Sequence, residues 1–190
     1  FPEIKSYSGK GVDDASASIR FSTTLFGLHV MSLSGKSGTF YIDTYTKDLN
    51  YYIVYNKKSI HKQENKFNCL VQDETAFVDA NTNNLQERLV NDGTFRQYRL
   101  AMACTIEYAA FHVAAAGLNS GTLAQKKAAV LSAMVVTMTR VNGLYERDMS
   151  LRMNLVANND IIIFITSDNF TNNNANALIN ESQTVIDGAI

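Results

Sequence analysis

The chain has 190 residues, of which 46% are hydrophobic and 18% are charged, and its formal net charge is −1 at pH 7. This composition can form a buried core and excludes a chain that is disordered along its whole length. The absence of a long basic run argues against nucleic-acid binding, and no apolar stretch approaches the roughly 20 residues of a membrane span. The chain begins with FPEIKSYSGKG, without an initial Met or a signal peptide, so we expect that it was trimmed from a longer precursor.

Residues 1–78 are rich in strand-forming patterns. IRFSTTLFGLHV alternates Ile19, Phe21, Thr23 and Leu25 on one face, and SGKSG at 34–38 indicates a turn. The aromatic and β-branched runs TFYIDTY and YYIVY, and then KFNCLVQ, are typical of further strands. These residues predict an antiparallel sheet made of hairpins. The polar, Asn-rich residues 79–94 predict an exposed linker, in which Arg88 could serve a processing protease.

Residues 95–190 have a different pattern. QYRLAMACTIEY alternates large and small residues, which predicts a strand covered on both faces. Thr122 and Gln125 form a capping box at the start of a long helix that we expect to run to Arg147, with Gly143 inside it. The apolar stripe of this helix comprises Leu131, Met134, Met138, Val141 and Tyr145.

Two further strands, MSLRMNLV and DIIIFI, and a final helix, ANALINESQTVIDGAI, follow the long helix. The last helix offers Leu178, Val185 and Ile186 for burial. Two strands joined through a long helix are expected to lie parallel, with a right-handed crossover. The fold class predicted for the whole chain is therefore α+β.

Residues that could carry out catalysis are scarce. His29, His61 and His112 are dispersed, and none belongs to an H-E-x-x-H motif. Glu107 is better explained as a solvent-facing charge at a strand end. Glu146, Arg147 and Asp148 are expected to pair locally at the helix end.

Three stretches nevertheless carry a family resemblance. FRQYRLAMACTIEYAAFH, VVTMTRVNGLYERDMSLRMNLVANNDIIIF and ESQTVIDGAI resemble the start of the catalytic domain of secreted bacterial reprolysin-like zinc metalloproteases, which are metzincins. T-R-V-N-x-x-Y-E-R-D is the most specific part. The β-rich residues 1–78 resemble the prosegment of such precursors, and residues 95–190 resemble the incomplete upper subdomain, a mixed sheet with a long backing helix.

The resemblance implies a secreted zinc endopeptidase that hydrolyses peptide bonds with a zinc-activated water. In that family the zinc-binding helix, H-E-x-x-H-x-x-G-x-x-H, comes later in the chain, and this sequence ends before it. We therefore expect a chain that is inactive alone and needs the C-terminal remainder of the catalytic domain as its partner. Zinc is the implied cofactor, calcium is a second candidate ion, and peptides or proteins are the substrates.

The two cysteines, Cys69 and Cys104, are too few for a disulfide framework, although one bridge between them is allowed. Cys104 is expected to be a buried small hydrophobe. Several metzincin prosegments use a cysteine thiolate to occupy the open zinc position, so the resemblance makes Cys69 a candidate latency ligand for the metal. The alternation of Phe67, Cys69 and Val71 supports a core position equally well, and both explanations stay open.

A second function class also stays open. The chain could be a non-catalytic secreted binding or adhesion module, with GTFYIDTY and YYIVY forming an aromatic platform. Tyr41, Tyr51 and Tyr55 would then line an open groove. If these rings pack into the sheet instead, the protease interpretation is favoured.

Overall fold

The computed structural model describes residues 1–60 and 93–190. The first part is a sheet of five strands that pair in chain order, each antiparallel to the next: β1 (Lys5–Lys10), β2 (Ser18–Thr24), β3 (Gly27–Ser34), β4 (Gly38–Thr44) and β5 (Tyr52–Asn56). A short 3-10 helix, η1 (Lys57–Ser59), follows β5. The predicted antiparallel sheet is confirmed over residues 1–60, whereas the predicted strand at KFNCLVQ and positions 79–92 of the linker lie outside the described residues.

The stretch IRFSTTLFGLHV forms a tight hairpin rather than one strand. β2 ends at Thr24 and β3 starts at Gly27, whose φ of 85° is unfavourable for residues with a side chain. The Thr44 hydroxyl donates a hydrogen bond of 2.6 Å to the carbonyl of Phe26 and holds the turn. The alternation of apolar residues continues through the turn, so it did not reveal where the chain reverses.

The second part contains two strands, three α-helices and one 3-10 helix: β6 (Arg96–Leu100), α1 (Ile106–Ala115), α2 (Leu123–Met149), β7 (Leu151–Leu155), η3 (Asn159–Ile162) and α3 (Ala175–Ala189). β6 and β7 pair in parallel, which confirms the arrangement predicted for two strands joined through a long helix. A single parallel bridge between Cys104 and Ile163 continues the contact beyond the two strands.

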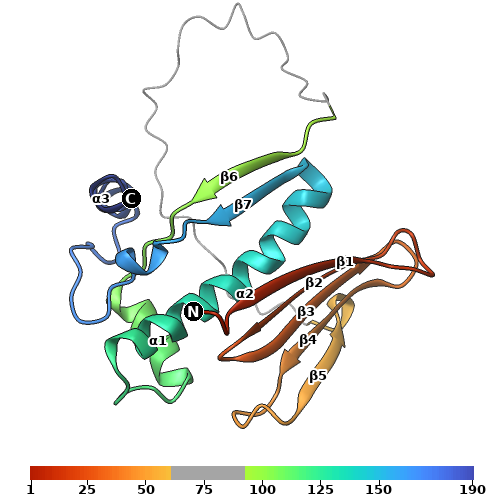
Figure 1. Ribbon diagram of the computed structural model, residues 1–190, viewed down its shortest axis with the longest axis horizontal. Helices are drawn as coiled ribbons and strands as arrows, with labels where there is room; N and C mark the ends of the chain where they lie inside the picture. The colour runs from red at the N-terminus through yellow and green to blue at the C-terminus, as the bar shows by residue number, and fades with distance from the viewer. Residues whose placement is uncertain (61–92) are drawn as a thin grey trace, which may run out of the picture.

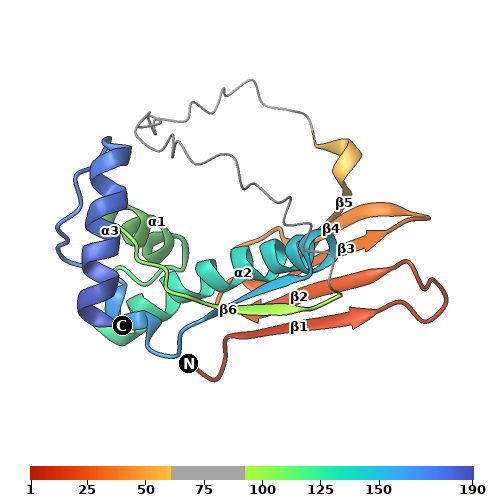
Figure 2. The same ribbon diagram turned by 90° about the horizontal axis from the view of Figure 1, so that it is seen from above.

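Helix α2 contacts both sheets and connects the two parts of the protein. It packs against β1, β2 and β3 on one side and against β7 on the other, and Figure 1 shows it running between the β6–β7 pair and the five-stranded sheet. Helices α1 and α3 lie toward the N-terminal end of α2, as Figures 1 and 2 both show. The described protein is thus a mixed α+β structure built around one helix.

The ends of α2 are close to the prediction. The Thr122 side chain accepts from the backbone N–H of Gln125, and the Gln125 side chain accepts from the backbone N–H of Thr122, so the predicted capping box is present. The helix continues past Gly143 to Met149 and ends at Ser150, which adopts the left-handed conformation with φ 51°. Gly143 therefore lies inside the helix, as expected.

By length and composition α2 could cross a membrane, because its most apolar 18-residue window has a mean hydropathy of 1.2. Half of that window is buried inside the protein. Core helices of folded domains share this composition. The absence of a membrane span stays a prediction.

The buried side of α2 differs from the predicted stripe. Met134 and Met138 are buried as expected, but Tyr145 is exposed. Ser132, Thr139 and Gly143 are buried instead, where the five-stranded sheet approaches the helix. Periodicity of large apolar residues locates one face of a helix, whereas a close contact with a second sheet selects small residues.

The strand predicted over QYRLAMACTIEY is confirmed only over residues 97–100, and the strand predicted over DIIIFI is wrong. Residues 106–108 begin α1, because the Thr105 side chain caps the helix and the Asp168 carboxylate accepts a 2.6 Å hydrogen bond from the Ile106 N–H. In α1, Ala109 and Val113 are the buried residues, and their spacing of four is the helical signal that the alternation obscured.

DIIIFI does not form a strand, since residues up to Ile162 form η3. The Asn159 side chain accepts from the Met102 N–H at 2.8 Å and donates to the Met102 carbonyl at 3.1 Å. One amide therefore takes the place of the strand pairing that a continued β-ladder would provide. Leu178, Val185 and Ile186 of α3, expected to be available for burial, are only half-buried.

Gly143 provides a test of the packing between α2 and the sheet. A Cβ atom at this position would lie 2.6 Å from Cε of Met31 and 2.7 Å from Cγ of Arg20. We expect Gly143→Ala to lower the free energy of unfolding by about 1–2 kcal/mol, because overpacking outweighs the gain in helix propensity. Urea denaturation measures the change. Gly188→Ala in α3, where an added Cβ meets nothing within 4 Å, is the matched control and should cause no loss.

Candidate functional site at the junction of α2 and β7

The C-terminal half of α2 concentrates polar side chains between the two sheets. Glu146, whose side chain is only 12% exposed, forms ion pairs with Arg20 of β2 and with Arg152 of β7. Arg152 Nε donates to Glu146 Oε1 at 2.6 Å, and Arg20 Nη2 donates to Oε2. One carboxylate therefore holds an arginine from each sheet.

Arg140 lies six residues before Glu146 on α2 and reaches β4 of the first sheet. Its Nη2 donates to Asp43 Oδ1 of β4 at 2.5 Å, and its guanidinium lies 5.2 Å from the centre of the Tyr41 ring. The Tyr55 hydroxyl donates to the other Asp43 oxygen at 2.5 Å, and burial together with Asp43 raises the pKa of Tyr55 to about 12. Asp43 is thus bound from the helix and from β5.

The side chain of Asn142 forms hydrogen bonds with the backbone of β7. Its Oδ1 accepts from the Met153 N–H at 2.9 Å and its Nδ2 donates to the Met153 carbonyl at 2.8 Å. The amide substitutes for a neighbouring strand, in the same way as Asn159 does at Met102. This bonding satisfies backbone groups that an edge strand would otherwise leave unpaired.

The remaining polar residues of the T-R-V-N-x-x-Y-E-R-D segment also have identified partners. The Thr139 hydroxyl lies 2.8 Å from the Ser6 hydroxyl of β1 and donates to the Val135 carbonyl at 2.7 Å. Arg147 pairs with its neighbour Asp148 at 2.6 Å in an exposed position, which confirms the predicted local pairing for these two residues. For Glu146 the prediction of local pairing is incomplete, because it also binds Arg20, which is distant in the sequence.

Two hollows lie on either side of these contacts. A groove of about 360 Å³ runs between β1 and β7, and Arg20, Asn142, Glu146 and Arg152 are among its lining residues. A cavity of about 420 Å³ lies between the first sheet, α1 and α2. Its lining is mostly apolar, and it includes His29 and His112.

The described residues do not bring the predicted site residues together as a metal centre. No group of three or more His, Cys, Asp or Glu side chains within residues 1–60 and 93–190 could hold a metal ion. His29 and His112, dispersed in the sequence, line the same cavity, and burial lowers the pKa of both. His61 and Cys69, the candidate latency ligand, lie outside the described residues. The zinc implied by the resemblance therefore does not fit the donors that the structure describes.

The other candidates have structural explanations. Cys104 is a free and buried thiol, as expected, and burial raises its pKa, which disfavours the reactive thiolate. Glu107 faces solvent, as expected, but from the first turn of α1 rather than from a strand end. Its carboxylate accepts a hydrogen bond of 2.7 Å from Asn172.

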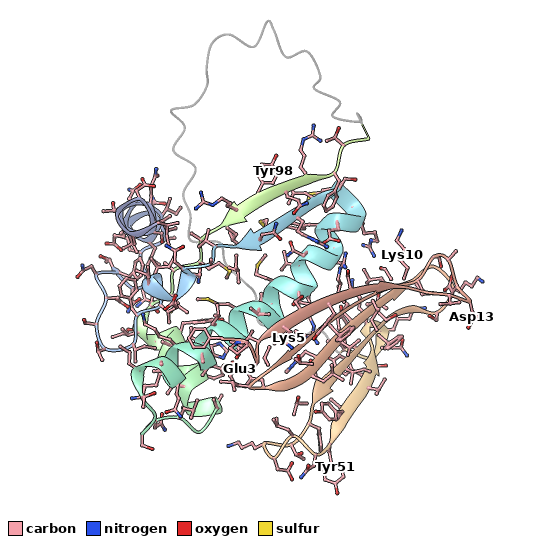
Figure 3. All side chains as sticks on the ribbon, in the orientation of Figure 1. Glu3, Lys5, Lys10, Asp13, Tyr51 and Tyr98 are labelled. Atoms are coloured by element: carbon pink, nitrogen blue, oxygen red, sulfur yellow. The ribbon has the colours of Figure 1, made fainter. Side chains whose placement is uncertain are left out.

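The tyrosines do not form the platform that a binding module would use. Tyr41 and Tyr55 stack on each other at 5.4 Å between ring centres and contact groups on the side of α2. Tyr51 is 65% exposed and projects from the far end of the sheet, near the bottom of Figure 3. The three rings therefore do not line one open groove.

Comparison with known proteins links one part of the chain to a family. Residues 131–190 match the family model of the reprolysin-like metallopeptidases of family M12B. The matched part begins within α2 and includes β7, η3 and α3, so this region is similar to metallopeptidases. No curated protein matches the chain, and no solved structure does.

The amide of Asn142 can be tested by substitution. Asn142→Ala removes two hydrogen bonds and leaves the N–H and carbonyl of Met153 unpaired, so we expect a loss of about 1–3 kcal/mol in the free energy of unfolding. Asn154→Ala is the control, because its exposed side chain makes one 3.0 Å bond to Gln97. An equal loss in both variants would show that Asn142 has no special role at the β7 edge.

Substitution of Glu146 should destabilise the protein more than substitution of Asp148, two residues away. Glu146→Gln keeps the shape but removes the charge shared by Arg20 and Arg152, and we expect about 1.5–3 kcal/mol of destabilisation. Asp148→Asn breaks an exposed pair with Arg147 and should hardly change the unfolding midpoint. Chemical denaturation of both variants in the same buffer measures the change in unfolding free energy that each substitution causes.

Proposed function

We propose that the chain comprises the prosegment and the N-terminal scaffold of the catalytic domain of a secreted zinc-dependent metalloendopeptidase. The observation that carries this proposal is the match of residues 131–190 to the reprolysin-like metallopeptidase family. Residues 95–190 would supply the sheet and the backing helix, and residues 1–78 would form the prosegment. Peptides or proteins would be the substrates of the complete enzyme.

The arrangement of β6, α2 and β7 supports a scaffold role. Two parallel strands backed by one helix bury little apolar surface, and two-stranded sheets are only marginally stable by themselves. Within the described residues β6 pairs only with β7, so its second edge has no strand partner. Tyr98, labelled on β6 in Figure 3, is 50% exposed. Such an edge is suited to receive another strand of a larger sheet.

The polar residues of the most specific segment also support this role. Thr139, Arg140, Asn142 and Glu146 bind the two sheets to each other through α2. None of them is placed as a nucleophile, a general base or a metal ligand. A structural role of this kind would account for the T-R-V-N-x-x-Y-E-R-D segment without a part in catalysis.

Zinc, when bound in such an enzyme, lowers the pKa of a bound water so that it attacks a peptide carbonyl at neutral pH. The described residues do not provide its ligands, and the sequence contains no H-E-x-x-H motif. The proposal therefore assigns the ligands to polypeptide other than these 190 residues. Cys69 remains the candidate prosegment ligand, and calcium remains a candidate second ion.

The chain alone is expected to be inactive. After incubation with Zn²⁺ and casein, chromatography should detect no released peptides, because a catalytic zinc ion needs the ligands of an H-E-x-x-H motif, which this sequence does not contain. Equilibrium dialysis followed by elemental analysis should find less than one tightly bound zinc per chain. Hydrolysis that a chelator abolishes would contradict the proposal.

The positive counterpart uses a longer product of the same coding sequence. We expect H-E-x-x-H-x-x-G-x-x-H to be encoded after Ile190, and the longer polypeptide to cleave casein once it is activated. Replacing the glutamate of that motif by alanine is the matched control and should abolish cleavage. A coding sequence without such a motif would overturn the assignment.

A further inference from the structure

His29 lies beside the ion pair that joins Asp43 of the first sheet to Arg140 of α2. It is on β3, and β2 places Ser22 directly opposite it. Its Nε2 is 3.7 Å from Asp43 Oδ1, the same oxygen that Arg140 of α2 binds at 2.5 Å. Its Nδ1 is buried and has no hydrogen-bond partner within the described residues.

The charges around His29 balance only while the imidazole is neutral. Asp43 is the single carboxylate of the cluster, and Arg140 already neutralises it. The Tyr55 hydroxyl, with its pKa raised to about 12, is neutral and donates to the second Asp43 oxygen. A protonated His29 would place a second cation beside the one carboxylate that Arg140 already binds, in a buried position where an uncompensated charge is costly.

Among the described residues, no other element brings a compensating anion to this cavity. The cavity beside His29 is lined by Lys47 from the β4–β5 turn and by His112 from α1, and none of its lining residues is acidic. Ser22 of β2 is fully buried, and its hydroxyl also has no partner within the described residues. Acidification therefore adds positive charge to a site that already has a surplus of cationic groups.

We propose that the contact between the five-stranded sheet and α2 is acid-sensitive, with protonation of His29 weakening the hold of the sheet on the helix. The inference rests on the proposed function only in treating residues 1–78 as a separable prosegment. Once the chain between the two parts is cut, the sheet stays bound to α2 at neutral pH and dissociates at mildly acidic pH.

The direction follows from proton linkage. Burial is the main cause that lowers the pKa of His29 below 6.5, with Arg140 acting in the same direction and Asp43 and the Gly27 backbone opposing it. A released sheet binds the proton more readily than the docked one, so the docked state loses stability as pH falls below about 6.5. The loss is complete below the pKa of the docked state, and docking is strongest at neutral and higher pH.

The test uses the full chain with a site-specific protease sequence introduced within residues 79–92. After cleavage, the two fragments should co-elute in size-exclusion chromatography at pH 7.5. At pH 5.5 we expect the dissociation constant, measured by analytical ultracentrifugation, to rise severalfold, with a limit of about tenfold for one group whose pKa in the released sheet is about 6.5. His29→Gln, which stays neutral, should change less than about threefold between the same pH values.

His112→Gln is the matched control, because His112 lines the same cavity but forms no ion pair among the described residues. Burial lowers the pKa of His112 as well, so this variant should keep most, but not all, of the pH dependence of the wild type. Fragments that separate at pH 7.5, a wild type without pH dependence, or equal effects of both substitutions would overturn the inference.

Direct titration keeps the test informative if His29→Gln does not fold. The NMR signal of His29 in the intact chain should give a pKa below 6.5, whereas a value at or above 6.5 would overturn the inference. Neither readout needs zinc or peptidase activity. Failure of the acid-sensitive contact is therefore distinguishable from failure of the metallopeptidase assignment.

Discussion

The carboxylate of Glu146 on α2 binds an arginine from each of the two sheets, Arg20 of β2 and Arg152 of β7. A buried carboxylate is costly unless it is paired, and here the two cations come from two different sheets. The position of each sheet relative to α2 therefore affects how well the other sheet is held. The described architecture depends on this shared ion-pair cluster more than on a large apolar core.

The apolar core itself is small. Cys104, Ala109, Val113, Val130, Met134 and Ile163 form the main cluster of buried hydrophobic residues. Around it, two asparagine side chains replace strand pairing, Asn142 at Met153 and Asn159 at Met102. Both bind the backbone through two hydrogen bonds, which fixes orientation as well as distance. A frame of this kind holds its strands in position, and among the described residues β6 pairs with β7 along one edge only.

The contact between α2 and the five-stranded sheet is more polar than the apolar core. The side of this sheet that faces α2 presents Ser6, Arg20, His29 and Asp43 to polar groups of the helix, with Gly143 allowing a close approach. Polar contacts of this kind give a defined geometry, and they respond to pH and salt more than apolar packing does.

Local signals in the sequence determined a large part of the secondary structure. The capping box at Thr122 and Gln125 located the start of α2, because its two hydrogen bonds form within four residues. Aromatic and β-branched runs indicated β4 and β5, and the order strand, helix, strand implied the parallel pairing of β6 and β7. The T-R-V-N-x-x-Y-E-R-D segment indicated the family to which residues 131–190 are similar.

Only the tertiary structure decided the rest, because the deciding partners are distant in the chain. DIIIFI is not a strand because Asn159 binds Met102, 57 residues away, and residues 106–108 are helical where Asp168 binds the Ile106 N–H, 62 residues away. His29 and His112 gave no sign that they line one cavity, and Glu146 gave no sign of Arg20, which lies 126 residues before it. Hydrogen bonds within one helical turn can be recognised from the local sequence, whereas an ion pair between two layers can be identified only from the folded structure.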